Sequence, residues 1–256
     1  MVEQKVVVSN IWRYPIKGLA GESLTTTILS SGRGIVYDRR WLLATADTAP
    51  LLNGNDKWRP WNYGLTLKKA ERMALLRCSV VDDNGAPLLS IYEKNEMRVC
   101  GHPQVPDERA NIDGFLQDFL FEPALQLTDY QNWSIWDKKD VVLTLLNESS
   151  VADFSTKQGV PVSCQRFRAN IEVRGMTAWK EMGGGVMHVG DVQLQLGDGV
   201  ERCAATRVNP QTAERDMNVP AQLLQEYGRN EMGVEAAVLT GGEIATSMEV
   251  VRSQTS

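Results

Sequence analysis

The chain has few of the residues from which most metal and redox sites are built. Among its 256 residues are two histidines, His102 and His188, and four cysteines, Cys78, Cys100, Cys164 and Cys203. The spacing of the cysteines matches no zinc ribbon and no Cys-x-x-Cys redox motif. Cys100 and His102 are near neighbours, but a closed zinc site needs four ligands. The pattern indicates reduced thiols and, as the default, a cytoplasmic protein.

Long runs of one kind of residue are also missing. The net charge is −5, the isoelectric point is near 5.2, and no long Lys/Arg run occurs, which argues against a nucleic-acid partner. No apolar run reaches the roughly 18 residues that cross a bilayer, and the opening MVEQKVVVSN has no small-residue cleavage site. We therefore expect neither a membrane span nor a secretory signal, and any anion-binding site must be local.

The remaining composition suits a protein of two modest domains, since 43% of the residues are hydrophobic. The first hundred residues alternate polar and apolar side chains and predict strands, with a hairpin turn at Asp83-Asn84-Gly85. The expected strands of the first half are residues 5–10, 23–29, 41–46, 73–81, 88–92 and 125–128. Apolar residues at helical spacing predict one helix over 108–121.

A polar stretch over 130–140 is interpreted as a linker, so we place the two domains at residues 1–128 and 129–256. The second half begins with a predicted buried strand, followed by a helix whose free amides Ser149 or Ser150 can cap. The expected strands of this half are residues 141–146, 192–196, 234–240 and 248–251, and a short helix is expected over 219–227. The sequence therefore predicts a mainly β (α+β) protein.

Four short loop segments are dense in cationic and hydrogen-bonding residues. They are YPIKGLAGESL from Tyr14, YDRRW from Tyr37, QRFRANIEV from Gln165, and ERCAATRVNPQT from Glu201. Arginine forks bind phosphate or carboxylate in a bidentate way, and glycines let backbone amides approach an anion. Each cation by itself suits a solvated surface or an ion pair. An anion site follows only where the fold gathers them.

Cys203 is the candidate nucleophile or metal ligand of the chain. A cysteine acts in either role as thiolate, a form that the neighbouring Arg202 and Arg207 favour. The alternative is a buried thiol that packs as a small apolar group. The residue types alone leave both open.

Taken in order, these motifs resemble the MOSC family, named for the C-terminal domain of molybdenum-cofactor sulfurase, in the form that carries an N-terminal MOSC β-barrel domain. The resemblance rests on YPIKGLAGESL, YDRRWLLA, VLTLLNESSVADFS, RFRANIEV, and VGDVQLQL followed by RCAATRVNPQT. It covers nearly the whole chain. It implies an N-terminal β-barrel-like domain, a C-terminal MOSC β-barrel domain, and a molybdenum cofactor (molybdopterin) held between them.

The resemblance also implies roles for individual residues. Cys203 would ligate molybdenum and be the catalytic residue. Lys17 and Arg39 would hold the cofactor from the first domain, and Arg168 and Asn170 from the second. The same motifs add four further candidate cofactor-binding residues: Arg40, Arg166, Arg202 and Thr206. In the loop 50–60, which departs from the family pattern, Asn53 is the candidate for the cofactor contact.

The implied function is a molybdenum-dependent oxidoreductase that reduces small N-oxygenated substrates, as the amidoxime reducing component and its bacterial counterparts do. The chain has no cysteine-rich ferredoxin extension after Val251, so we expect electrons from a separate ferredoxin-like or flavoprotein-like partner. Two alternatives stay open. Cys203 could carry sulfur as a persulfide in a sulfurtransferase, or the chain could be a non-catalytic molybdopterin-binding module.

Overall fold

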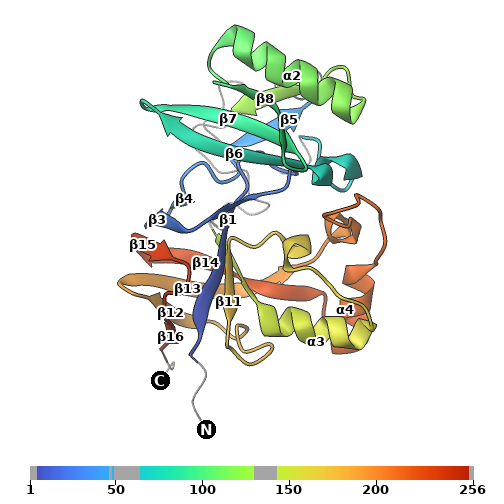
Figure 1. The fold of residues 1–256 in the computed structure, drawn as a ribbon. Coiled ribbons are helices and arrows are strands. Elements are labelled where there is room, and N and C mark those ends of the chain that lie inside the picture. The colour runs from blue at the N-terminus through green and yellow to red at the C-terminus, as the bar shows by residue number, and fades with distance from the viewer. Residues whose placement is uncertain (1–4, 46–47, 49–63, 130–142, 254–256) are drawn as a thin grey trace.

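The computed structural model describes residues 5–45, 48, 64–129 and 143–253, and Figure 1 shows how their elements are arranged. Strands make up most of the regular structure, so the predicted mainly β class is confirmed. The strands of the first half are β1 (Val7–Arg13), β2 (Glu22–Leu24), β3 (Thr26–Ser30), β4 (Gly34–Ile35), β5 (Trp41–Ala44), β6 (Leu76–Asp83), β7 (Ala86–Glu93), β8 (Glu96–Gly101) and β9 (Gln126–Asp129).

The second half contributes further strands and most of the helices. Its strands are β10 (Leu143–Asn147), β11 (Ile171–Arg174), β12 (Gly185–Val189), β13 (Val192–Glu201), β14 (Glu231–Thr240), β15 (Gly242–Ala245) and β16 (Val250–Arg252). The helices of the chain are α2 (Pro106–Leu120), α3 (Glu148–Gln158) and α4 (Val219–Tyr227), with short 3-10 helices η2 (Glu71–Leu75), η3 (Cys164–Phe167) and η4 (Ala204–Arg207). Among the described residues, no helix combines the length and the apolar character needed to cross a bilayer.

One eight-stranded sheet contains strands from both ends of the chain. Its order is β16-β12-β13-β14-β10-β11-β1-β2, and β1 pairs antiparallel with β11. The start of the chain is thereby hydrogen-bonded into the sheet of the second half, and the last strand, β16, belongs to the same sheet. The boundary between residues 1–128 and 129–256 stays a prediction.

The upper part of Figure 1 is a smaller β unit. It contains the antiparallel β6-β7-β8 sheet and the β5-β9 pair, with α2 beside them. A third small sheet, β15-β3-β4, joins strands from both halves of the chain. Each sheet in the described part of the chain has two free edges, so no closed barrel is found among these strands.

Three apolar clusters hold these layers together. The first is formed mainly by residues of the β6-β7-β8 sheet, of α2 and of the loops around them. The second is formed mainly by residues of the eight-stranded sheet, and the third by residues of that sheet and of the helices α3 and α4. The first cluster also includes Val208 and Ala213, which follow Cys203 in sequence. Burial of these two residues holds the segment that follows Cys203 against the first half of the chain, because the transfer of apolar side chains out of water is favourable.

Local sequence signals predicted several elements well. The turn at Asn84 and Gly85 has positive φ at both residues (52° and 87°) and joins β6 to β7 as expected. The predicted helix 108–121 is α2, which begins two residues earlier because Pro106 occupies its first turn, where a missing N–H costs nothing. The predicted strands 192–196 and 234–240 lie within the longer β13 and β14.

Other details of the prediction were wrong. The cap of α3 is Asn147, whose side chain accepts the amide of Ser149 (3.0 Å), while the Ser150 hydroxyl instead donates to buried Glu181 (2.7 Å). The single strand expected over 23–29 is two strands, β2 and β3. The strand expected over 73–81 begins only at Leu76, after the 3-10 helix η2. The predicted linker 130–140 lies outside the described residues.

Candidate functional site

A cavity of about 720 Å³ lies where the four motif segments meet. Seven of the residues predicted from the sequence line it: Lys17, Arg39, Arg166, Arg168, Arg202, Cys203 and Thr206. They come from loops and turns that are up to 189 positions apart in the chain (206 minus 17). The fold thus gathers the cations, which was the condition for an anion site. We call Lys17, Arg39, Lys68, Arg166, Arg168 and Arg202, which all line this cavity, the cationic face.

Cys203 lies two residues after the end of β13 and is the N-cap of the 3-10 turn η4. Its backbone is extended (φ −108°), and its carbonyl oxygen accepts the amide of Thr206 (3.0 Å) and the hydroxyl of the same residue (2.8 Å). The thiol is free and half-buried. Thr206 therefore fixes the turn on which the thiol stands, and the sulfur is reachable from the cavity.

Two arginines from different halves of the chain flank one buried tyrosine. The guanidinium carbons of Arg39 and Arg168 lie 4.9 and 4.5 Å from the ring centre of Tyr14, which is 2% exposed. Burial raises the pKa of the Tyr14 hydroxyl well above its ordinary value. Both arginines have positive φ (51° and 54°), a conformation that costs about 1–3 kcal/mol and persists where packing imposes it. Tyr14 thus positions a cation from each half.

Asn170 does not line the cavity, although the resemblance implied a cofactor contact. It is fully buried, its amide nitrogen donates to the Trp12 carbonyl (3.1 Å), and its amide oxygen accepts from Thr144 N (3.2 Å) and Arg39 Nη1 (3.3 Å). Asn170 therefore links β1, β10 and the loop that carries Arg39 by hydrogen bonds. It orients Arg39 rather than facing the ligand space.

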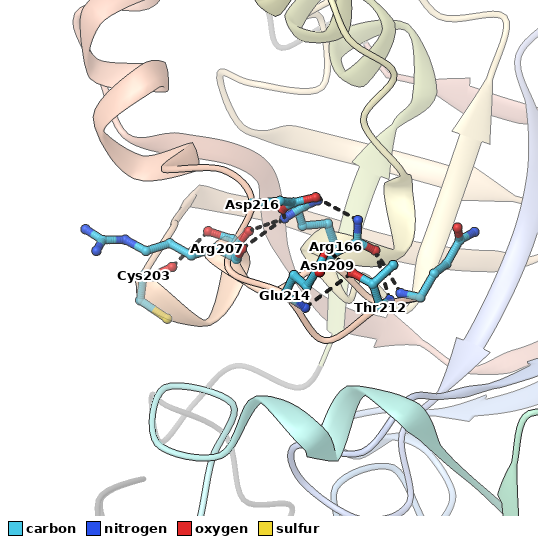
Figure 2. A network of polar contacts seen from close by, with 9 residues as sticks. Arg166, Cys203, Arg207, Asn209, Thr212, Glu214 and Asp216 are labelled. Atoms are coloured by element: carbon cyan, nitrogen blue, oxygen red, sulfur yellow. Dashed lines mark hydrogen bonds and ion pairs between the residues drawn. The ribbon is translucent and has the colours of Figure 1, made fainter.

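Arg166 braces the turn that carries Cys203. Its Nη1 donates to the carbonyls of Thr206 (3.1 Å) and Arg207 (3.2 Å), and the guanidinium pairs with Asp216 (2.9 Å), as Figure 2 shows. Burial alone would raise the pKa of Asp216, but hydrogen bonds from Arg166 and Asn209 outweigh it and lower that pKa. In Figure 2 the Cys203 sulfur points away from this network, so the brace leaves the thiol free for other contacts.

Arg202 is held still more tightly. Its guanidinium donates to the carbonyls of Phe167 (2.8 Å) and Met232, with Nε 2.8 Å from the latter. Burial lowers the pKa of Arg202 to about 10. The positive charge of Arg202 therefore lies next to Cys203 in sequence, and the backbone carbonyls of Phe167 and Met232 hold it in place.

Arg40 is a second predicted residue, after Asn170, that is not among those lining the cavity. Arg40 forms a bidentate pair with Asp129 (2.8 and 2.8 Å) and stacks over the Trp41 ring (4.9 Å), so it links β5 and β9 instead. Arg40 does not line the cavity, where a cofactor contact was predicted. Asn53 lies outside the described residues.

Sequence reasoning missed several lining residues. Thr66 and Lys68 line the cavity from the segment before η2, and four acids line it from β13 and β14: Asp198, Glu201, Glu231 and Glu235. Glu201 directly precedes Arg202 and Asp198 lies four residues before it, so both were visible beside the motif in the sequence. Glu231 and Glu235 give no local signal, since only the pairing of β13 with β14 brings them to the site.

Three buried polar atoms of residues that line this cavity have no hydrogen-bond partner in the structure: Oγ1 of Thr66, Nε of Arg166 and Oε2 of Glu231. Thr66 and Arg166 are 8% and 6% exposed, and Glu231 is half-buried. Buried polar atoms normally have partners, so such atoms suit a polar ligand. The described residues contain no group of three or more His, Cys, Asp or Glu that could hold a metal ion. A metal at Cys203 would therefore need ligands other than the described His, Cys, Asp and Glu side chains.

Two family models match the chain. The model of the MOSC N-terminal beta barrel domain matches residues 5–112, and that of the MOSC domain matches residues 134–251. Together they contain all four motif segments. The candidate site lies between elements of both matched regions.

The chain is also similar to named proteins. The mitochondrial amidoxime reducing component 2 of Bos taurus is 26% identical, over 88% of this chain and 73% of that protein. The molybdenum cofactor sulfurase of Homo sapiens is 22% identical, over 83% of this chain but 28% of that protein. Among solved structures, the YUAD protein from Bacillus subtilis covers 98% of this chain and 97% of its own, with 11% identity and a TM-score of 0.46.

Proposed function

This chain belongs to the MOSC family, as its motifs predicted, and we propose that it binds a molybdenum cofactor in the cavity at Cys203 and reduces small N-oxygenated compounds there. The single observation that supports the proposal most is the convergence of a half-buried free thiol and the cationic face on one cavity of about 720 Å³. The reductase activity is proposed by likeness to relatives named amidoxime reducing components.

The residues present fit such a cofactor. Molybdopterin carries a phosphate, and Lys17, Arg39 and Arg168 line the cavity with the cations that a phosphate dianion needs. Thr66 Oγ1 and Arg166 Nε lack partners and suit its polar groups. The Cys203 thiolate is a soft ligand of the kind that thiophilic metals select. When bound, the cofactor would supply oxygen-atom transfer coupled to two electrons.

The chain's own residues would bind and orient. Tyr14 and Asn170 hold Arg39 and Arg168 in place before any ligand arrives, which limits the entropy lost on binding. Thr206 and Arg166 fix the turn that presents the Cys203 sulfur. In the proposed reaction the N–O bond breaks, the nitrogen compound gains two electrons and two protons, and water leaves. A separate iron–sulfur protein or flavoprotein would supply the electrons.

Metal analysis tests the proposal. Protein is expressed in a molybdenum-replete host as wild type and as Cys203→Ala, and molybdenum per chain is measured after purification. We expect near-stoichiometric molybdenum in the wild type and a large loss in the variant, with Cys100→Ala as the matched control for an exposed thiol elsewhere. Equally negligible molybdenum in all three proteins would refute cofactor binding.

A second candidate is sulfur transfer through a Cys203 persulfide. The likeness to proteins named molybdenum cofactor sulfurase favours it, as does the reachable thiol on a fixed turn. Incubation with a cysteine desulfurase should then add the mass of one sulfur, about 32 Da, to the Cys203 peptide. Absence of that adduct under conditions that load a known acceptor would exclude it. Bound cofactor without any reduction of N-hydroxylated compounds would instead indicate a non-catalytic binding module.

A further inference from the structure

A second cavity, of about 520 Å³, borders the one at Cys203. Its lining comes from both matched regions, from residues 12–95 and from residues 165–210. The two cavities share three lining residues, Leu67, Arg166 and Arg168, whereas Cys203 and Lys17 line only the first. A cavity of this volume accommodates a small organic molecule. Most of its lining is its own, so binding there can be separated by mutation from binding at the thiol.

Aromatic and apolar side chains form one part of this lining. Trp12 lies on β1 and Tyr14 directly after it, and Leu67 and Val208 are buried residues of the same cavity. Gly21 also lines it, and a Cβ at this position would come within 2.7 Å of Tyr14 Cε1. The missing side chain of Gly21 therefore leaves room for the Tyr14 ring beside the cavity. Such a wall favours a ligand with a flat apolar body.

The charged part of the lining is mainly cationic. Three arginines line the cavity: Arg77, Arg166 and Arg168. The one lining carboxylate is Glu22, whose charge is balanced by an ion pair with Arg13 (2.7 Å). The guanidinium carbon of half-buried Arg77 lies 4.0 Å from the ring centre of Tyr92, and no ion pair with a described residue is recorded for Arg77. The positive charge of Arg77 therefore favours an anionic ligand.

Arg166 adds a hydrogen-bond donor to the same wall. This residue is 6% exposed, and its terminal nitrogens bond the carbonyls of Thr206 and Arg207 and the carboxylate of Asp216. Its buried Nε has no hydrogen-bond partner, although buried polar atoms normally have one. An acceptor atom in either cavity could complete these bonds, because Arg166 lines both. Arg77, which lines only the second cavity, is therefore the residue that distinguishes the two sites.

We propose that the second cavity binds a small aromatic carboxylate, with its ring among the apolar side chains beside Trp12 and Tyr14 and its carboxylate paired with Arg77. A guanidinium donates two parallel hydrogen bonds to a carboxylate, which adds direction to the charge attraction. The ring leaves water for an apolar wall, which a bare inorganic anion cannot do. This site goes beyond the proposed function, since it requires neither Cys203 nor a metal.

The test is direct binding of two isosteric probes, 2-naphthoate as the anion and 2-naphthamide as its neutral counterpart. Binding is measured by ligand-observed NMR or calorimetry on the purified full chain. We expect 2-naphthoate to bind at least about fivefold more tightly, with the difference shrinking at high salt. Inorganic phosphate should compete only weakly, because it has no apolar body.

Three variants locate the probe. Arg77→Gln should weaken 2-naphthoate binding several-fold and leave 2-naphthamide binding within about twofold of wild type. Lys17→Gln is the matched control, since it removes a cation that lines only the Cys203 cavity, and it should keep the affinity for both probes. Ser23 is exposed on the edge strand β2 and is the cross-strand partner of Trp12, so Ser23→Trp adds a ring on the Trp12 face and should weaken both probes.

Each other outcome overturns the inference. Equal affinity for the two probes would remove the selection for charge, and phosphate that competes as well as 2-naphthoate would remove the role of the ring. Lys17→Gln as weak as Arg77→Gln, or unchanged binding in Ser23→Trp, would place the probe outside the second cavity. The readout does not depend on molybdenum, so a chain without the metal would fail the proposed function and keep this site. Absence of probe binding would leave the metal analysis untouched.

Discussion

The cationic face of the cavity and its four acids are built in opposite ways. We call these acids, Asp198, Glu201, Glu231 and Glu235, the acidic face. The cations come from distant segments, and Arg39, Arg166 and Arg202 are each held by buried carbonyls or carboxylates before a ligand arrives. The acids come from one pair of adjacent strands, and no ion pair with a described residue is recorded for Glu201 or Glu231. The cationic face is therefore part of the framework, whereas no ion pair with a described residue holds Glu201 or Glu231.

Removing Tyr14 tests the framework role of the cationic face and has the largest expected effect. Tyr14→Ala should lower the free energy of unfolding by about 3–5 kcal/mol, the range for deleting a buried aromatic ring, because Arg39 and Arg168 both pack on it. Tyr14→Phe loses only the hydroxyl bond to the Ala169 carbonyl (3.2 Å) and should cost about 1 kcal/mol. Urea denaturation measures both. Equal costs would show that the ring does not align the two arginines.

The ion pair between Arg166 and Asp216 should make the free energy of unfolding depend on pH in the acid range. Hydrogen bonds from Arg166 and Asn209 overcome burial and hold the pKa of Asp216 below its ordinary value, so the unfolded chain binds this proton more readily. The stabilisation is therefore complete above about pH 4 and is lost as the pH falls below it. Wild type should lose stability more steeply than Asp216→Asn in urea unfolding measured between about pH 5 and 3.

A matched control for this pH effect comes from the acidic face. Asp198→Asn removes an exposed acid for which no ion pair with a described residue is recorded, and it should follow the wild-type pH profile. If Asp216→Asn and wild type lose stability in parallel on acidification, the pair with Arg166 contributes nothing to the fold.

Neutralising the acidic face should have the smallest effect on stability. Glu201→Gln/Glu231→Gln removes a like-charge pair that faces across two strands, so the free energy of unfolding should change by no more than about 0.5 kcal/mol or rise slightly. Thermal and urea unfolding measure this change. A loss as large as that expected for Tyr14→Ala would make the acids part of the framework and erase the contrast between the faces.

Much of the site could be predicted from the chain alone. Lys17, Arg39, Arg166, Arg168, Arg202, Cys203 and Thr206 were all predicted from their motifs, and all line one cavity. Arg39 and Arg40 show the limit of this reasoning. The two neighbours carry the same charge in the same motif, yet Arg39 lines the cavity and Arg40 pairs with Asp129. Positive φ at Arg39 and the pairing of β5 with β9 decide their directions.

Asn170 and Glu231 show the same limit in other ways. Asn170 was predicted at the ligand, but full burial against Trp12 and Thr144 makes it a support for Arg39. Glu231 gave no signal, because its place at the cavity depends on its register with Glu201 across the β13-β14 pair. Neither outcome depends on residues nearby in sequence.

The sequence by itself determined the β-rich class, the hairpin at Asn84-Gly85, the helix α2, and the chemistry available at Cys203. These features depend on turn propensities, on periodicity and on the side chain itself, which are properties of a short stretch of chain. Only the tertiary structure decided which cations line the cavity, which are bound to backbone carbonyls, and that four carboxylates line the same cavity. Those outcomes depend on packing and strand register between segments far apart in the chain, and no local pattern encodes them.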